Sequence, residues 1–228
     1  MDILGSPIEI SDSDQTVNRI CKLKLHYWRK GILFLDVLAM IFCISSFITP
    51  RWVEQGKTEN FWRGSLMKCG GCNGKFEGAS YKQISEWSCG DMDGYCETFD
   101  GLYKAGIAVL LIQSMFLLLL VVGIYIIVCE LVNKHYENKL VFVTTLITPL
   151  CEIIALITWI LTSGAKMNNE CYSNATNMEK AHNVCATHGP ILMIMSILMS
   201  ICATILFIFI RPATKKAFKN KIIPVDDR

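Results

Sequence analysis

Apolar and polar residues follow one another along this chain in long blocks, not in the short periods of a soluble domain. Four predominantly apolar blocks are each long enough to cross a bilayer core of roughly 30 Å, at a rise of about 1.5 Å per residue. They run over residues 31–49, 105–128, 140–163 and 190–210. Every backbone amide in lipid must bond within its own segment, so the blocks predict helices. The expected fold is an all-α membrane protein, a bundle of four transmembrane helices.

Charge adds an orientation to this picture. The formal net charge is only +2, which argues against nucleic acid as a partner. Basic residues gather before the first span, between spans two and three, and after span four; they include Lys22, Lys24, Arg29, Lys134, Lys139, Arg211 and Lys216. The positive-inside rule makes these segments cytoplasmic. Both termini are then predicted inside the cell, in tails 1–30 and 211–228, and the loops 50–104 and 164–189 face outward.

No linker divides the chain, so residues 1–228 are interpreted as one domain. A long polar stretch precedes the first apolar block, and no small-residue cleavage site follows it. The block is therefore interpreted as a retained span and not as a cleaved signal sequence. Together these features predict a multi-pass protein of the plasma membrane, with the lipid bilayer as its first partner.

The first outer loop is rich in glycine, with aromatic residues and short segments between the glycines. Glycine turns separated by segments such as Tyr81–Ser85 favour a small antiparallel sheet over a helix. A sheet of that size is marginally stable in water unless something else holds it together. We therefore expect a covalent staple in this loop.

The cysteines are suited to that role. The chain has 11 cysteines, and each outer loop holds an even number of them: Cys69, Cys72, Cys89 and Cys96 in the first, Cys171 and Cys185 in the second. Disulfides form in the oxidising exterior, so Cys171 is expected to pair with Cys185. Four cysteines in one loop allow three pairings. We favour Cys69 with Cys89 and Cys72 with Cys96.

Two other interpretations of the Cys69-x-x-Cys72 pair were weighed. Four thiolates suit zinc, but Cys89 and Cys96 lack the spacing of a zinc ribbon. A redox pair needs a helix N-terminus to lower the thiol pKa, and nothing after Cys72 predicts a helix start. Structural disulfides are preferred, with no metal and no cofactor.

Trp52 directly follows the first span, and the segment Gly64-Ser65-Leu66-Met67-Lys68-Cys69 lies downstream of it. This pattern resembles the claudin superfamily, which includes claudins, peripheral myelin proteins and the gamma subunits of voltage-gated calcium channels. The family signature is a Trp after span one, then Gly-Leu-Trp-x-x-Cys, then a further Cys. Ser65 and Leu66 stand where the family has Leu and Trp, and Trp62 is a candidate to fill the missing Trp's volume. The chain thus resembles a divergent member.

The resemblance implies a left-handed four-helix bundle capped by an extracellular sheet, and a function exerted by contact. A claudin-like protein forms homo-oligomers in cis and in trans at cell–cell junctions and makes a paracellular barrier or an ion-selective path, as in a tight junction. Charged residues of the first loop would set the selectivity; the candidates are Glu54, Glu59, Glu77 and Lys75. The alternative is an auxiliary, gamma-like subunit that modulates an ion channel or receptor. The last residues, Val225–Arg228, lack the hydrophobic end that PDZ domains bind in many claudins, which weakens the junction hypothesis.

Polar residues inside the spans mark further candidates. Asp36 and Glu152 are ionisable, and a charge in lipid usually marks a site or a pair. Glu152 lies near mid-depth, one turn after Pro149, which frees a backbone carbonyl. Gln113 lies at a comparable depth and is predicted to hydrogen-bond to Glu152. Structural bonding between helices is preferred over ion or proton conduction.

Two kinds of modification are also predicted. Asn174-Ala175-Thr176 is an N-glycosylation sequon on the second outer loop, which would make the protein a glycoprotein. Cys129 and Cys21 lie at the cytoplasmic edge and are candidates for palmitoylation. No Ser-His-Asp set, phosphate loop or pair of His ligands is present in the sequence pattern, so we do not expect an enzyme.

Overall fold

A computed structural model of the chain describes residues 19–20, 23–55, 62–70, 76–88, 95–133, 139–167 and 184–222. The longest elements are four helices: α2 (Leu25–Ile48), α4 (Tyr95–Asn133), α5 (Lys139–Ser163) and α6 (His188–Ile222). All four are long and apolar enough to cross a membrane. The prediction of a helical membrane protein with four spans is confirmed to this extent.

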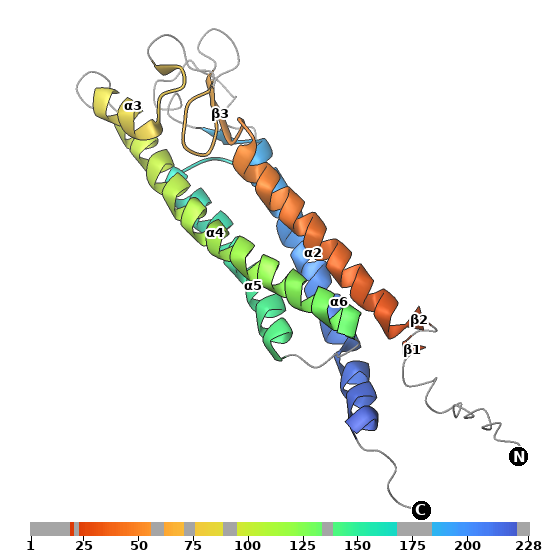
Figure 1. Cartoon of the computed structure of the whole chain (residues 1–228). Coiled ribbons are helices and arrows are strands. Elements are labelled where there is room, and N and C mark those ends of the chain that lie inside the picture. Colours follow the sequence, from red (N-terminus) through yellow and green to blue (C-terminus); the bar gives the residue numbers. More distant parts are fainter. Residues whose placement is uncertain are drawn as a thin grey trace, which may run out of the picture.

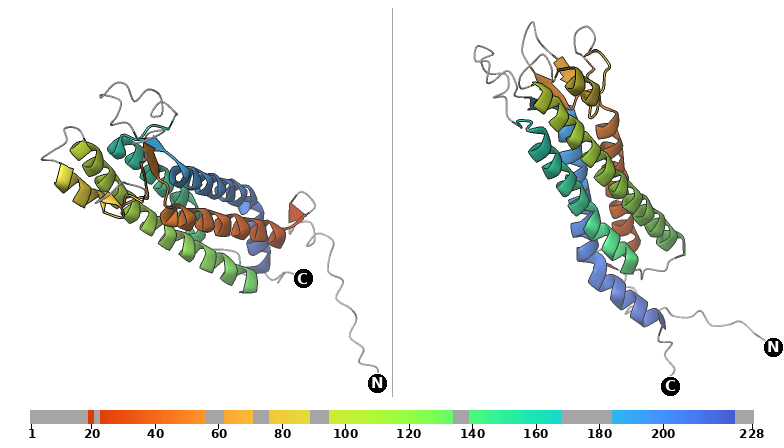
Figure 2. Two further views of the ribbon diagram at one scale, coloured as in Figure 1. Left: turned by 90° about the horizontal axis from the view of Figure 1, so that it is seen from above. Right: turned by 90° about the vertical axis from the view of Figure 1, so that its left-hand side faces the viewer.

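The four helices lie side by side in an up-and-down bundle (Figures 1 and 2). α2 packs mainly against α6, and α4 packs mainly against α5. A three-stranded sheet and the short helix α3 (Tyr81–Ser88) gather at one end, which we call the sheet end; α2 begins and α6 finishes at the opposite end, which we call the tail end (Figure 1). The last turns of α6 project beyond the other helices (Figure 2).

The outward faces of the helices carry large apolar side chains. Leu111 and Leu118 on α4 and Leu161 on α5 are 65%, 68% and 77% exposed. Exposing such side chains to water is unfavourable, whereas contact with lipid tails, which are as apolar as leucine, carries no such penalty. The bundle is therefore built to be surrounded by acyl chains.

The helices are longer than the predicted spans. α2 begins at Leu25 and not at Gly31, α4 begins at Tyr95 and not at Ala105, and α6 continues to Ile222. Apolar composition locates the lipid-crossing part of a helix, whereas backbone hydrogen bonding continues into polar sequence. α4 as a whole has 39 residues, a length of about 58 Å. It is longer than a bilayer core is thick, so one end of α4 stands outside the lipid.

Three strands form an antiparallel sheet at the sheet end. β3 (Val53–Gln55) is central, with β4 (Trp62–Gly64) on one side and β5 (Cys185–Ala186) on the other. Val53 lies opposite Gly64 and Ala186, which fixes the register. The predicted small antiparallel sheet is confirmed, but its third strand comes from the second loop, which the sequence pattern did not indicate. A separate pair, β1 (Arg19–Ile20) and β2 (Leu23–Lys24), precedes α2 at the tail end.

The prediction of a sheet segment at Tyr81–Ser85 is wrong, because these residues open helix α3 (Tyr81–Ser88). Ser80 Oγ accepts a hydrogen bond from the Gln83 backbone N–H at 3.3 Å, and Gln83 Oε1 accepts one from the Ser80 N–H at 3.1 Å. This reciprocal capping box starts a helix. Tyr81, Ile84 and Ser85 face inward while Lys82 and Glu86 face outward, as expected of an amphipathic helix.

Candidate functional site

Trp52 joins the sheet to the bundle. Its side chain is fully buried, its indole Nε1 donates a hydrogen bond to the Ser46 carbonyl of α2 at 2.6 Å, and its ring meets Trp159 of α5 edge-on, 5.2 Å between centroids. Its backbone N–H donates to the Gly64 carbonyl and its carbonyl accepts from the Thr187 N–H, at 2.6 and 3.0 Å. One residue thus connects two helices and both loops.

Gly189, at the start of α6, closes the other side of this joint. A Cβ at this position would lie 2.5 Å from three atoms of the Trp52 ring, which is far inside van der Waals contact. The Gly189 N–H also donates to the Arg51 carbonyl at 2.8 Å. The indole therefore lies directly on the backbone of α6, and only glycine permits that approach.

The remaining residues of the claudin-like pattern meet at the same joint. Leu66 and Cys69 are 4% and 0% exposed and belong to the hydrophobic cluster that contains Trp52. Gly64 pairs with Cys69 in a β-bridge, and a Cβ on Gly64 would overlap the Tyr81 hydroxyl. The sequence motif therefore describes one packed unit.

Aromatic side chains fill the space around this motif. Trp62 is buried, stacks on Phe99 with centroids 5.3 Å apart, and donates its indole N–H to the Gln55 side chain. Tyr81 is fully buried and donates its hydroxyl to the Ser65 carbonyl at 2.6 Å. Burial raises the pKa of Tyr81, so the phenol remains a hydrogen-bond donor at physiological pH. Trp62 and Leu66 belong to the same buried cluster.

The predicted disulfide cysteines divide into two groups. Cys69, Cys96 and Cys185 are disulfide-bonded. Cys72, Cys89 and Cys171 lie outside the described residues, so the pairings stay a prediction. Among the described residues, no three His, Cys, Asp or Glu side chains gather as a metal site would require.

The solvent-facing side of the sheet end carries charge and one large aromatic ring. Glu54 on β3 lies opposite Arg63 on β4, and Glu77 is exposed. Trp87 of α3 is 44% exposed and stacks on Phe76, 6.2 Å between centroids. Glu59 and Lys75, the other proposed selectivity residues, lie outside the described residues, as do Asn174 and Cys21.

The predicted hydrogen bond between Gln113 and Glu152 does not form. Gln113 is fully buried, and its amide nitrogen donates to Ser46 Oγ of α2 at 3.5 Å. The Ser46 hydroxyl gives its own proton to the Cys43 carbonyl at 2.7 Å, which leaves its oxygen as an acceptor for the amide. The wrong expectation has a geometric cause: sequence position gives depth in the membrane but not which helix faces which.

Glu152 is fully buried in α5, and neither of its carboxylate oxygens has a hydrogen-bond partner among the described residues. The Ser196 hydroxyl of α6 lies near the Glu152 carboxylate. This hydroxyl, however, donates its hydrogen bond to the Ala39 carbonyl of α2 at 2.8 Å. The serine thus links α6 to α2 and leaves the carboxylate without a donor. This polar layer crosses the bundle near the middle of its length.

The carbonyl freed by Pro149 does find a partner. Proline lacks the N–H that would bond to the carbonyl of Thr145, four residues earlier. Thr204 Oγ1 of α6 lies 2.8 Å from that carbonyl and 2.8 Å from the Ser200 carbonyl of its own helix. The sequence indicated only that this carbonyl is freed; its partner on α6 was not predicted.

One buried contact was missed by sequence reasoning. Arg29 of α2 forms an ion pair with Glu130 of α4 at the tail end, and both side chains are almost fully buried. Arg29 was counted with the basic tail, yet it lies inside a helix. A signal was present: each residue borders a long apolar block, and two opposite charges at the same predicted depth are candidates to pair.

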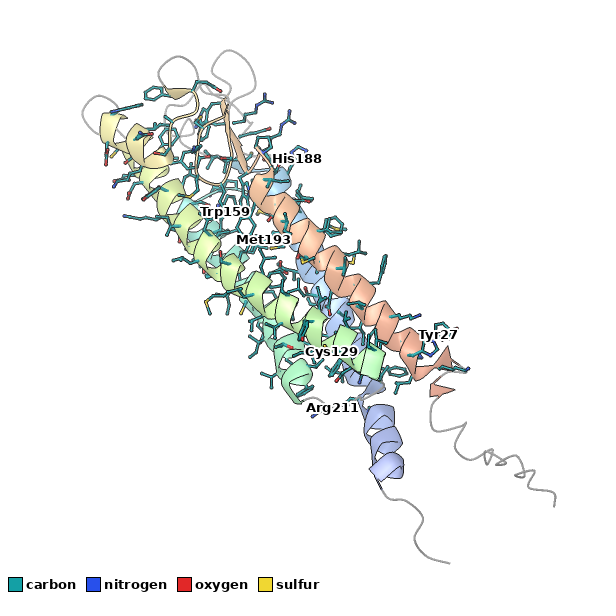
Figure 3. All side chains as sticks on the ribbon, viewed as in Figure 1. Tyr27, Cys129, Trp159, His188, Met193 and Arg211 are labelled. Carbon is teal, nitrogen blue, oxygen red and sulfur yellow. The ribbon has the colours of Figure 1, made fainter. Side chains whose placement is uncertain are left out.

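Two further residues lie nearby. Cys129 on α4 is a half-buried free thiol at the tail end (Figure 3), so its palmitoylation stays a prediction. Asp36 of α2 is 7% exposed and lines a cavity with residues of α4, α5 and α6. Trp159 and Met193 lie closer to the sheet end (Figure 3), in the aromatic cluster of the joint.

No protein-family model matches this sequence, and no curated protein sequence matches it either. The geometry of the joint and of the buried polar groups therefore has to carry the functional argument.

Proposed function

We propose that this chain is a divergent claudin-like protein of the plasma membrane that acts by contact between neighbouring cells. In this proposal the sheet end faces the exterior and both termini are cytoplasmic, as the distribution of basic residues predicts. Copies of the chain bind laterally within one membrane and head-to-head between two membranes. The contact acts as a paracellular barrier or an ion-selective path.

The observation that carries the proposal is that the sheet end, which we call the head, is fixed to the helices. β3 and β4 come from the first loop and β5 from the second, and Trp52 ties all of them to α2, α5 and α6. A domain mounted in this way loses little conformational entropy when it binds a partner, because it is already ordered. This small entropy loss favours adhesion between two membranes.

The surface of the head also favours binding. Trp87 exposes 44% of its side chain, and tryptophan is the residue type most enriched in binding hot spots. Lys82 and Glu86 flank it on the same helix as an exposed ion pair at 3.9 Å, a polar rim that suits the edge of an interface. Glu54 and Glu77 are the described candidates for charge selectivity.

The claudin-like motif supports the family part of the proposal. The residues of this motif are separated by short stretches of sequence, and the fold brings them together. Trp52, Leu66 and Cys69 belong to one buried cluster. Gly64 pairs with Cys69 and accepts a hydrogen bond from the Trp52 N–H. Leu66 occupies its buried position without the family's Trp. The predicted disulfides, with Cys171–Cys185 closing the second loop, would hold this head together in the oxidising exterior.

Mixed cell layers test the proposal. Tagged wild-type protein is expressed in half of the cells of a polarised layer, and its density is measured at contacts between two expressing cells and at contacts between unlike cells. Head-to-head binding predicts enrichment only at the like contacts, with a change in transepithelial resistance. Trp87→Ala should lose the enrichment with only a small decrease in thermal stability; Lys104→Ala, which removes an exposed pair with Asp100 on α4, is the matched control.

Equal density at both kinds of contact would overturn the junction proposal. If the protein instead co-purifies from dispersed membrane sites with a pore-forming channel and shifts its gating, the auxiliary-subunit alternative replaces it.

A further inference from the structure

A small cavity lies inside the bundle, on the tail-end side of the Glu152 layer. It is lined by residues from all four helices, among them Asp36 of α2, Gly123 of α4, Thr145 and Thr148 of α5, and Ser200 of α6. Its volume of about 10 Å³ is that of one water-sized sphere. The cavity thus has room for a single small ligand.

The carboxylate in this cavity lacks a counter-charge. Asp36 is 93% buried, its exposed fraction being 7%. No ion pair joins it to another side chain in the part of the chain that the structure describes. The nearest buried cation on its own helix, Arg29, is paired with Glu130. A carboxylate in this position needs a positive charge or a proton.

The threonine hydroxyls Thr145 and Thr148 do not donate hydrogen bonds to that carboxylate. Thr145 Oγ1 donates to the Val141 carbonyl at 2.7 Å, and Thr148 Oγ1 donates to the Thr144 carbonyl at 2.5 Å. Each hydroxyl has only one proton, and here it is used within α5. The cavity therefore collects acceptor oxygens: two from the carboxylate, with about four lone-pair sites, and one from each threonine hydroxyl.

Ser200 completes the set from the opposite side. Its hydroxyl is buried and has no hydrogen-bond partner among the described residues. An unsatisfied polar atom that is buried in this way calls for an unseen partner such as an ion or a water. Both helices of the α5–α6 interface thus present oxygen to one point.

A cation satisfies every one of these groups at once. Carboxylate and hydroxyl oxygens are the ligands that hard cations take in proteins. One carboxylate neutralises one positive charge, so a monovalent ion leaves the membrane interior neutral, whereas a divalent ion would leave an uncompensated charge there. We propose that this cavity binds one sodium-sized monovalent cation, with Asp36 as the charged ligand and Thr145, Thr148 and Ser200 as neutral oxygen ligands.

The ion would have a structural effect, because its ligands come from three helices. It joins α2 to the α5–α6 interface, which otherwise meets α2 through contacts such as the Ser196 hydroxyl. A ligand that binds only the folded state raises the unfolding temperature in proportion to the logarithm of its concentration. Sodium should therefore stabilise the bundle.

The full-length protein in detergent micelles, dialysed free of sodium, provides the test. Its unfolding temperature is measured in NaCl, KCl and choline chloride at one ionic strength and one pH, and bound ²²Na⁺ is counted by equilibrium dialysis. The expected result is a rise with sodium, a smaller rise with potassium, none with choline, and one sodium bound per chain. Asp36→Asn should abolish both signals.

Two further variants keep the test decisive if Asp36→Asn folds poorly. Gly123→Ala places a methyl group 3.6 Å from Thr144 Oγ1, an ordinary contact that fills the cavity without a clash. It should raise the half-saturating sodium concentration about tenfold or more, about 1.4 kcal/mol in binding free energy, because the methyl group takes space that the ion would occupy. Glu152→Gln, which changes a different buried carboxylate of the bundle, should leave sodium binding unchanged.

Equal unfolding temperatures in the three salts, with no bound ²²Na⁺, would overturn the proposal. An infrared carboxylic-acid band that disappears in Asp36→Asn would then show that Asp36 carries its own proton. Sodium binding that survives in Gly123→Ala and Asp36→Asn would also overturn it, because the ion would occupy another site. None of these results bears on cell–cell contact, so the proposed function stands or falls separately.

Discussion

The two halves of the bundle interior are held together by different means. Toward the sheet end, Trp52, Trp159 and Met193 belong to one buried hydrophobic cluster, and a side chain larger than that of Gly189 would overlap the Trp52 ring. Toward the tail end, the interior holds the Arg29–Glu130 ion pair and the hydroxyl-lined cavity around Asp36. The tail-end half also has a buried hydrophobic cluster, which includes Leu25, Ile127 and Phe207. It differs from the sheet-end half in adding buried charges and hydroxyl groups to that packing. The difference predicts that size-changing substitutions damage the first half most and charge-removing substitutions the second.

Trp52→Ala is expected to have the largest effect. It removes a fully buried ring and the hydrogen bond to Ser46, and a large-to-small change of this kind costs about 3–5 kcal/mol. Thermal unfolding and limited proteolysis of the loops measure the loss. The half-exposed Trp87→Ala serves as control and should lower stability by well under half of that amount. Equal effects of the two variants would contradict a joint built on Trp52.

Arg29→Ala tests the charged half. It leaves Glu130 buried without its partner, and breaking a buried pair in this way costs about 3–5 kcal/mol. The double variant Arg29→Met with Glu130→Met removes both charges and should recover most of the unfolding temperature. If the single and double variants are equally unstable, packing and not charge holds this end together.

Gly189→Ala changes volume alone and sharpens the contrast. The added methyl group would enter the Trp52 ring, and overpacking a well-packed core costs about 1–3 kcal/mol. The matched control is Gly123→Ala in the tail-end half, where the same methyl group finds ordinary contact distance and improves helix propensity. The expected signs are opposite, and thermal unfolding of both variants in sodium-free buffer reads them directly.

Thr204→Val should have the smallest effect. It keeps the side-chain shape but removes the hydroxyl that lies 2.8 Å from the Thr145 carbonyl. Hydrogen bonds between membrane helices contribute about 0.6 kcal/mol on average, and the carbonyl left by Pro149 then has no donor from α6. A decrease of several degrees in the unfolding temperature would show that this hydrogen bond contributes more to stability than the average one between membrane helices.

Some features could be predicted because they depend on local sequence. The four spans follow from apolar blocks, and the freed carbonyl follows from Pro149 alone. The capping box Ser80-x-x-Gln83 is visible in the sequence and predicts a helix start, which favours a helix over a strand at Tyr81–Ser85. The partner of Gln113 was not predictable, because depth along a helix says nothing of the direction in which a side chain points around it.

The pairing of β5 with β3 was also beyond reach of a local pattern. Cys185–Ala186 is two residues long, too short to show any alternation, and its partner strand lies more than a hundred residues earlier in the chain. The Asp36 cavity depends on the same kind of long-range assembly, since its lining comes from four separate helices. Non-local geometry of this kind emerges only when the bundle closes.

The shared sheet limits how this protein could be recombined with another protein of the same architecture. Because β5 supplies an edge of a sheet whose other strands come from the first loop, the two loops form a single inheritable module. A chimaera that exchanges one loop would combine strands and Trp52 contacts that come from different proteins. An exchange of both loops together with the start of α6 would keep the sheet and the Trp52 contacts intact.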